Sequence, residues 1–109
     1  MTSDDASTLR TAADRLERLA ARTTVGDWRV GGLLASRPEV VAHAPDGGTE
    51  HVAEARAATA AWITALSPAV AGPLVSWLRA TADSGRPDRS ALALARVLLG
   101  RLPHAPEGP

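Results

Sequence analysis

The sequence contains no cysteine, phenylalanine, tyrosine, lysine, asparagine or glutamine. Without cysteine, the chain can form no disulfide framework and perform no thiol chemistry. Its only aromatic residues are Trp28, Trp62 and Trp77. Many of the apolar residues are alanines with little surface to bury, and so the three indoles must fill much of the core volume. We expect all three mainly in the core, with the alternative that one completes an interface between subunits.

Charge of neither sign is in excess, with 12 basic residues against 12 acidic ones. Nucleic-acid-binding proteins usually carry a basic surplus, and so nucleic acid is not an expected partner. No run approaches the ~18 apolar residues that span a bilayer, because the longest candidate, 55–66, contains Arg56, Thr59 and Thr64. The acidic, polar start also lacks the pattern of a secretory signal. These absences predict a cytoplasmic protein without a membrane partner.

The chain length of 109 residues suits one domain and is too short for two with separate cores. A chain of this size buries enough surface to fold without metals or disulfides. We therefore predict a single globular domain over residues 1–102. Residues 103–109, which contain three prolines, are predicted to form a disordered tail.

The first segment predicts a helix that Ser3 or Asp4 caps and that ends near Arg22. Asp4 and Asp5 place negative charge in the first turn, where the helix dipole favours it. The apolar residues of this segment recur at three- and four-residue spacing, which is the helical period; they are Leu9, Ala12, Ala13, Leu16, Leu19 and Ala20.

Residues 27–51 lack a helical stripe and contain four glycines and two prolines. The patterns at 28–30 and 39–44 predict strands, with a continuation at 33–35 and a short third strand at 49–52. A turn is expected at 36–38, and residues 45–48 give a strong turn signal. We therefore expect a two- or three-stranded antiparallel meander, whose free edge invites pairing with a second copy of the chain.

Three helices are expected after the meander. Ser67 and Pro68 mark the boundary between the first two, because serine caps a helix and proline suits its first position. This boundary is expected to direct Trp62 and Trp77 towards the same core. The first helix spans 54–66, and its apolar residues form one stripe, Ala58, Ala61, Trp62, Ala65 and Leu66.

Proline and glycine predict how the last two helices are divided. Pro73, after Gly72, predicts a kink or a restart of the second helix, and Gly85 predicts its end. Asp88 is the expected cap of the last helix, and Gly100 is its expected stop. The predicted fold class is therefore α+β, with one N-terminal helix, the small antiparallel meander and three C-terminal helices that share one core.

His43 and His51 are the candidates for a metal or proton-transfer site. If strands 39–44 and 49–52 pair, the two imidazoles approach each other, with Glu39 and Glu50 nearby. Such a cluster suits a divalent metal, but its spacing matches no defined motif, and we assign no metal and no cofactor. The serines lack a Gly-x-Ser-x-Gly context and a base, and the glycine pairs match no phosphate loop. No catalytic residue is assigned.

Four arginines lie on or before the last predicted helix: Arg86, Arg89, Arg96 and Arg101. They favour either a phosphate or nucleic-acid contact or a solvated face matched to acidic residues elsewhere. A helix-turn-helix glycine pattern is missing. A regulatory nucleic-acid-binding protein is therefore kept as an alternative.

Several sequence landmarks occur in a characteristic order. A helix rich in Leu, Ala and Arg is followed by TVGDWRV at 24–30, VVA at 40–42, AAWITALSPAV at 60–70, LVSWL at 74–78 and ALALARVLLG at 91–100. Over residues 9–100 this order resembles small actinobacterial and actinophage proteins that are similar to the Ead-like accessory proteins of phages. Val25 and Asp27 stand where that group usually has proline, and Trp62 where it usually has tyrosine. The resemblance implies a phage- or prophage-related accessory protein, or a chromosomal relative, and no reaction.

We therefore expect a non-enzymatic protein-interaction protein, an accessory or adaptor protein that acts as a homodimer and binds another protein. The alternatives are a small-molecule- or metal-binding protein or enzyme that uses the hairpin of His43 and His51, and the nucleic-acid-binding protein. The candidate interface residues are Trp28, Val41, Trp62, Pro73 and Trp77.

Overall fold

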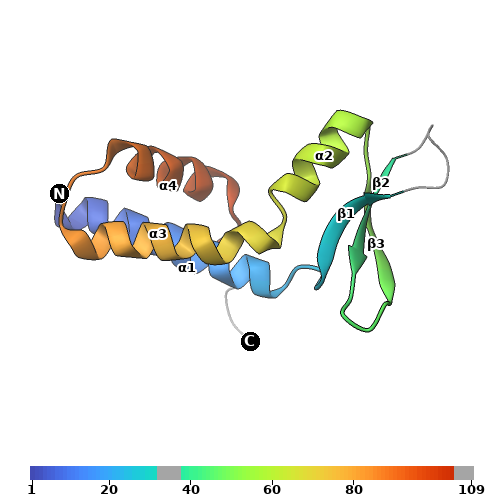
Figure 1. The fold of residues 1–109 in the computed structure, drawn as a ribbon. Coiled ribbons are helices and arrows are strands. Elements are labelled where there is room, and N and C mark those ends of the chain that lie inside the picture. Colours follow the sequence, from blue (N-terminus) through green and yellow to red (C-terminus); the bar gives the residue numbers. More distant parts are fainter. Residues whose placement is uncertain (32–37, 105–109) are drawn as a thin grey trace. The chain divides into compact units, whose positions relative to one another are not determined.

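The computed structural model describes residues 1–31 and 38–104 (Figure 1). The fold is α+β, as predicted, with an N-terminal helix, a three-stranded antiparallel sheet and then helices. The described residues form two compact units: a helical unit of residues 1–22 and 71–104, and a sheet unit of residues 23–70. The elements in chain order are α1 (Ser3–Ala21), β1 (Asp27–Gly31), β2 (Glu39–His43), β3 (Thr49–Glu54), α2 (Ala57–Ala65), the 3-10 helix η1 (Pro68–Val70), α3 (Ala71–Ser84) and α4 (Arg89–Arg101).

The first helix of the helical unit begins one residue earlier than predicted. Thr2 is the N-cap of α1, and its hydroxyl accepts a hydrogen bond from Asp5 N at 3.0 Å. Thr2 N donates in return to Asp5 Oδ2 at 3.4 Å, which completes a capping box. The helix ends at Ala21, with Arg22 as its C-cap, as the sequence predicts.

The core of the helical unit lies between α1, α3 and α4. Leu9 and Leu78 are its largest fully buried side chains. Most of its other residues are alanines, which let the helices approach closely, and dispersion and burial of apolar surface hold them together. The buried residues are Leu9, Ala12, Ala13, Val75, Leu78, Ala82, Ala91 and Ala95. No residue of α2 belongs to this cluster, and so the expectation that all three C-terminal helices share one core was wrong: α2 packs against the sheet instead.

Pro73 restarts the chain as a helix, which was one of the two predicted outcomes. The 3-10 helix η1 starts with a bond from Val70 N to Ser67 O at 2.9 Å, and α3 begins at Ala71. Pro73 therefore lies in the first turn of α3, where a backbone N–H needs no helical partner. Gly85, with φ of +69°, follows the last residue of α3.

The last helix has the predicted beginning and a later end. Asp88 is its N-cap, and the Asp88 Oδ1 atom accepts a hydrogen bond from Ala91 N at 2.9 Å. The predicted stop at Gly100 was wrong, because α4 continues to Arg101 and its C-cap is Leu102. Gly100 keeps a negative φ within the helix, and the helix ends before Pro103, since proline disfavours helical geometry in the preceding residue.

The three predicted strands are present in the sheet unit and lie in the order β1-β2-β3. The predicted turn at 45–48 joins β2 to β3: Ala44 N donates to Gly48 O at 2.8 Å, and Gly47 adopts a φ of +91°. The predicted continuation at 33–35 lies outside the described residues, as do all but Pro38 of the predicted turn at 36–38 and residues 105–109 of the predicted tail.

The two faces of this sheet differ in chemistry. Val40 and Ala42 of the central strand are buried, and Trp28 shares their face because it lies opposite Ala42. The other face carries charged residues, among them Asp27 and Arg29, whose side chains form an ion pair at 2.6 Å. Since α2 packs against β1 and β2, it lies on the apolar face.

Candidate interaction surface

The helix α2 is built from apolar residues and threonine, with no charged residue inside it. It comprises nine residues from Ala57 to Ala65, and Arg56, its N-cap, makes no side-chain capping bond. A helix this short is marginal alone in water, so packing must stabilise it. Ala60 is its one buried residue, with 0% of its surface exposed. Ile63 and Thr64 are half-buried on the same side of the helix, three and four residues further on.

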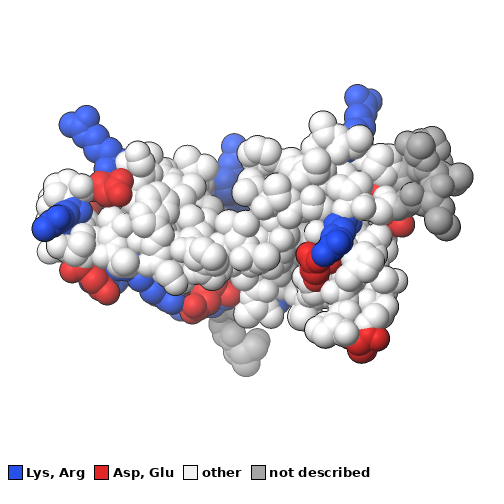
Figure 2. All heavy atoms as spheres, viewed as in Figure 1, with Lys and Arg blue, Asp and Glu red and all other residues white. Residues whose placement is uncertain are grey.

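The opposite side of α2 faces solvent. Trp62 is 68% exposed and Leu66, at the C-cap, is 55% exposed. We call this surface the α2 stripe; its residues are all exposed and recur at helical spacing: Ala58, Ala61, Trp62, Ala65 and Leu66. Figure 2 shows that most atoms over α2 in this view belong to uncharged residues, with one basic side chain at the upper end of the helix.

The α2 stripe is the apolar stripe predicted from the sequence, and its orientation is the opposite of the predicted one. Trp62 was expected mainly in the core, and this was wrong. Ala60, Ile63 and Thr64 occupy the buried side of α2, and Trp62 lies outside that side. Because α2 is apolar on all sides, its periodicity could not indicate which side faces the sheet.

The other candidate interface residues are distributed over both units. Trp28 is half-buried, and its indole Nε1 donates to Thr24 O at 3.0 Å. Val41 is half-buried on the charged face of the sheet. On α3, Pro73 and Trp77 are exposed, and their spacing of four residues puts them on one helix face.

Trp77 and Trp62 were expected to point towards the same core. Trp77 belongs to the helical unit and is 40% exposed, whereas Trp62 belongs to the sheet unit. Neither indole is buried, and so this expectation was wrong. The physical reason is that alanine, leucine and valine fill the core of the helical unit without an aromatic residue.

His51 pairs with Glu39 rather than with His43. The Nδ1 atom of His51 lies 2.7 Å from Glu39 Oε2, and His51 lies opposite Val41 in the sheet. His43 lies opposite Thr49, on the other side of Val41. Among residues 1–31 and 38–104, no group of three or more His, Asp or Glu side chains could hold a metal ion. The arrangement of His51 and Glu39 is that of an exposed surface pair.

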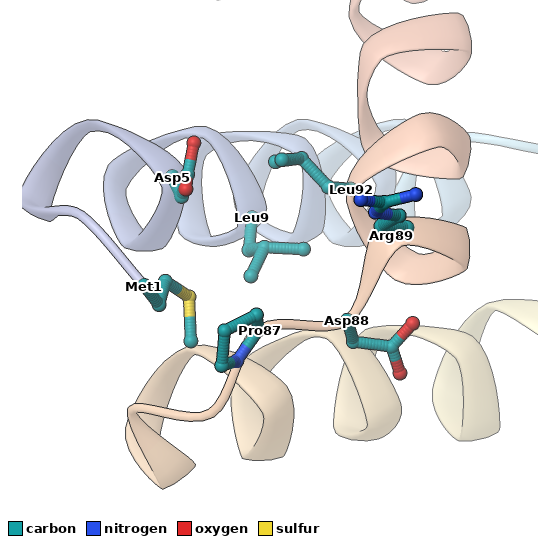
Figure 3. A pocket seen from close by; sticks show the side chains of 7 residues that line it. All are labelled: Met1, Asp5, Leu9, Pro87, Asp88, Arg89 and Leu92. Carbon is teal, nitrogen blue, oxygen red and sulfur yellow. The ribbon is translucent and has the colours of Figure 1, made fainter.

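One small cavity lies in the helical unit, near the start of α1 and the start of α4 (Figure 3). Its volume of about 130 Å³ is below the ~300 Å³ of typical ligand sites. Two of its carboxylates already serve as helix caps, since Asp5 completes the capping box and Asp88 caps α4. The lining residues are Met1, Asp5, Leu9, Pro87, Asp88, Arg89 and Leu92. The cavity is therefore a small gap between helix ends, and both of its carboxylates take part in helix caps.

The balanced total charge conceals opposite charges in the two units. The described part of the helical unit has nine arginines and six acidic residues. The described part of the sheet unit has two arginines and five acidic residues. Within the helical unit Arg79 and Arg10 form ion pairs with acidic residues. Arg89 and Arg96 are seven residues apart on one face of α4, whereas Arg101 lies on another. The four arginines named from the sequence therefore do not form a single stripe.

The segment Ala57–Ser84 is long and apolar enough to cross a membrane, by length and composition alone. The expectation that no stretch reaches this level was too strict. It treated Arg56 and two threonines as interruptions, whereas residues 57–78 contain no charged side chain at all. Core helices of soluble proteins meet the same criterion, and so no location follows from it.

No protein-family model, no curated protein and no solved structure matches this chain. The exposed side of α2 was missed from the sequence, although the run of 22 residues without a charge from Ala57 to Leu78 was the signal that could have indicated it.

Proposed function

We propose that this protein is a non-enzymatic accessory or adaptor protein of the cytoplasm that acts as a homodimer and binds another protein. The observation that supports this proposal is the α2 stripe, an exposed apolar surface on a helix without charges. The resemblance of the sequence to Ead-like phage accessory proteins adds a phage or prophage context to the proposal.

Burial of the α2 stripe by a partner would be energetically favourable. Helices that are apolar on all sides normally lie inside a protein or another apolar environment, and contiguous exposed apolar patches mark interaction sites. Fully burying one large apolar side chain contributes about 1.5–3 kcal/mol. Trp62 and Leu66 still have more than half of their surface to bury, and tryptophan is enriched among the residues that dominate binding energy.

The test compares the wild-type chain with Trp62→Glu and Leu66→Glu. The matched control is Val97→Glu, since Val97 is an exposed apolar residue of α4, at 61%. Light scattering at high micromolar concentration should give the mass of a dimer for the wild type. A strict monomer at that concentration would contradict the homodimer.

A pull-down from the native host tests the protein partner separately. We expect the wild type and Val97→Glu to capture the same partner, and both α2 variants to lose it, because a buried carboxylate without a partner charge is costly. Equal capture by all four proteins would exclude the α2 stripe as the binding surface. The captured protein would also name the pathway.

A further inference from the structure

β1 is an edge strand with an open side. β2 pairs with β1 on one side and with β3 on the other. Apart from its pairing with β2, no backbone hydrogen bond joins β1 to any other residue in the ranges 1–31 and 38–104. An unpaired strand edge is a template for pairing with another chain.

The two edges of the sheet are not equivalent. β3 carries Glu50 and Glu54, and the register shift between Val40 and Val41 puts a bulge in its pairing with β2. Acidic residues and bulges both discourage edge pairing. β1 instead carries one charge of each sign, Asp27 and Arg29, two residues apart on the same face and both exposed.

We propose that two copies of the chain pair antiparallel along β1, about a two-fold axis at Trp28. This inference rests on the proposed homodimer and assigns its interface. In this register Trp28 lies opposite Trp28 of the partner subunit, and Asp27 lies opposite Arg29 of the partner subunit. The two-fold axis repeats that opposite-charge pair on the other side. A register centred on Arg29 instead brings two guanidinium groups opposite each other, which is unfavourable.

The position of α2 fits the same arrangement. A two-fold axis perpendicular to the sheet keeps both α2 helices on one face of a six-stranded sheet. Because α2 packs against β1 and β2, the two helices lie about two strand spacings apart, which is ~10 Å. Helices that pack against each other lie about 8–10 Å apart. The dimer therefore brings the two α2 helices side by side.

The area needed by a dimer explains why α2 must contribute. A stable interface buries about 800 Å² on each partner, and one strand of five residues supplies only part of this. The α2 helix adds apolar surface beside that strand, including part of Leu66 and Trp62. The pairing of β1 gives the register, and the apolar contact of α2 gives most of the buried area.

Charge reversal tests the register. Asp27→Arg and Arg29→Asp each replace two attractive pairs with two repulsive ones, and should weaken self-association by roughly tenfold or more. The double variant Asp27→Arg/Arg29→Asp should restore the dimer. An equimolar mixture of the two single variants should form a heterodimer, because each charge then meets its opposite. Analytical ultracentrifugation measures the association, and circular dichroism checks that each variant is folded.

Charge reversal on β3, the other edge strand of the sheet, is the matched control. Glu50→Arg and Glu54→Arg change exposed charges of β3 and should leave the dimer unchanged. The proposal would be overturned if the β3 variants weakened the dimer and the β1 variants left it unchanged. A monomeric wild type would reject the homodimer itself, whereas a wild-type dimer insensitive to every β1 variant would reject only this interface.

A disulfide gives a second measurement that does not depend on charge. Residues directly opposite each other in antiparallel strands have Cα atoms about 4.5–5.5 Å apart, which is within the range of disulfides. The chain has no cysteine, so Trp28→Cys can crosslink only to its own copy. Covalent dimer under mild oxidation is the expected result. A folded, dimeric Trp28→Cys protein that does not crosslink would contradict the two-fold axis at Trp28.

Discussion

Arg79 Nη1 on α3 donates a hydrogen bond to Glu17 Oε2 on α1 at 2.9 Å, and so joins two helices from opposite ends of the sequence. The Arg79 Nη2 atom also donates to Asp14 Oδ1 at 2.8 Å, one helical turn earlier on α1. Both contacts lie at the surface of the helical unit. They hold α1 and α3 in one register above a core made largely of alanine.

This pair predicts an acid-sensitive contribution to stability. The hydrogen bond and charge of Arg79 hold the pKa of Glu17 below its ordinary value. Since the folded pKa is the lower one, the pair stabilises the fold above the unfolded pKa, about 4.3, and this contribution is lost as the pH falls through the folded pKa. Glu17→Gln should therefore unfold at lower urea concentration than the wild type at pH 7, with little difference at pH 2.5. A difference of equal size at both pH values would contradict the assignment, and Glu50→Gln is the control.

Leu78 is predicted to carry a large share of the stability of the helical unit. Its side chain is 0% exposed, between α1, α3 and α4. Leu78→Ala removes buried apolar surface and leaves a cavity, which costs about 2–5 kcal/mol. Val97→Ala, at an exposed valine of α4, should change the free energy of unfolding by less than about 0.5 kcal/mol. Urea unfolding measures both, and equal effects would show that Leu78 is not a core residue.

The cap of α4 gives a prediction about a single hydrogen bond. Asp88→Ala removes the acceptor for Ala91 N and should cost about 0.5–2 kcal/mol. Asp88→Asn keeps an acceptor oxygen and should retain most of that stability. Thermal unfolding of the two variants separates the hydrogen bond from the negative charge. If asparagine proved as damaging as alanine, charge rather than the hydrogen bond would be the main contribution.

Two glycines are predicted to respond in opposite ways to alanine. Gly26 has a φ of +126°, and a Cβ atom there would lie 2.8 Å from His43 O. Gly26→Ala should therefore destabilise the protein by more than about 1 kcal/mol. Gly100, inside α4 and not followed by proline, has no neighbouring atom outside its own helix within 4 Å of such a Cβ, and Gly100→Ala should stabilise by about 0.5–1 kcal/mol. If both substitutions destabilised the protein, the effect of Gly26→Ala could not be assigned to the positive φ of Gly26.

Local signals in the sequence predicted much of the fold. Asp88 caps α4 and Gly85 follows the end of α3. Both roles depend on local backbone geometry and nearest neighbours, and so they could be predicted without a structure. The turn at 45–48 and the strands on either side of it follow from the same local chemistry. Gly100 failed as a stop because a glycine can also remain helical, and Pro103 lies three residues further on.

The candidate site was predicted less well. Trp62 was wrongly expected in the core, because the periodicity of α2 does not indicate which side of the helix faces the sheet. Its role as an interface candidate stays a prediction. His51 was expected to approach His43, with Glu39 and Glu50 nearby, and the structure confirms the approach of Glu39. The register places His51 opposite Val41 and within 2.7 Å of Glu39.

By itself, the sequence determined the cap of α4, the end of α3 before Gly85, the turn at 45–48, the three strands and the absence of thiol chemistry. These features depend on residues within a few positions of one another. Only the tertiary structure decided that α2 packs on the sheet with Ala60 buried and Trp62 in solvent. The reason is that a helix that is apolar on every side can turn any side inward, and only packing against β1 and β2 selects the side of Ala60.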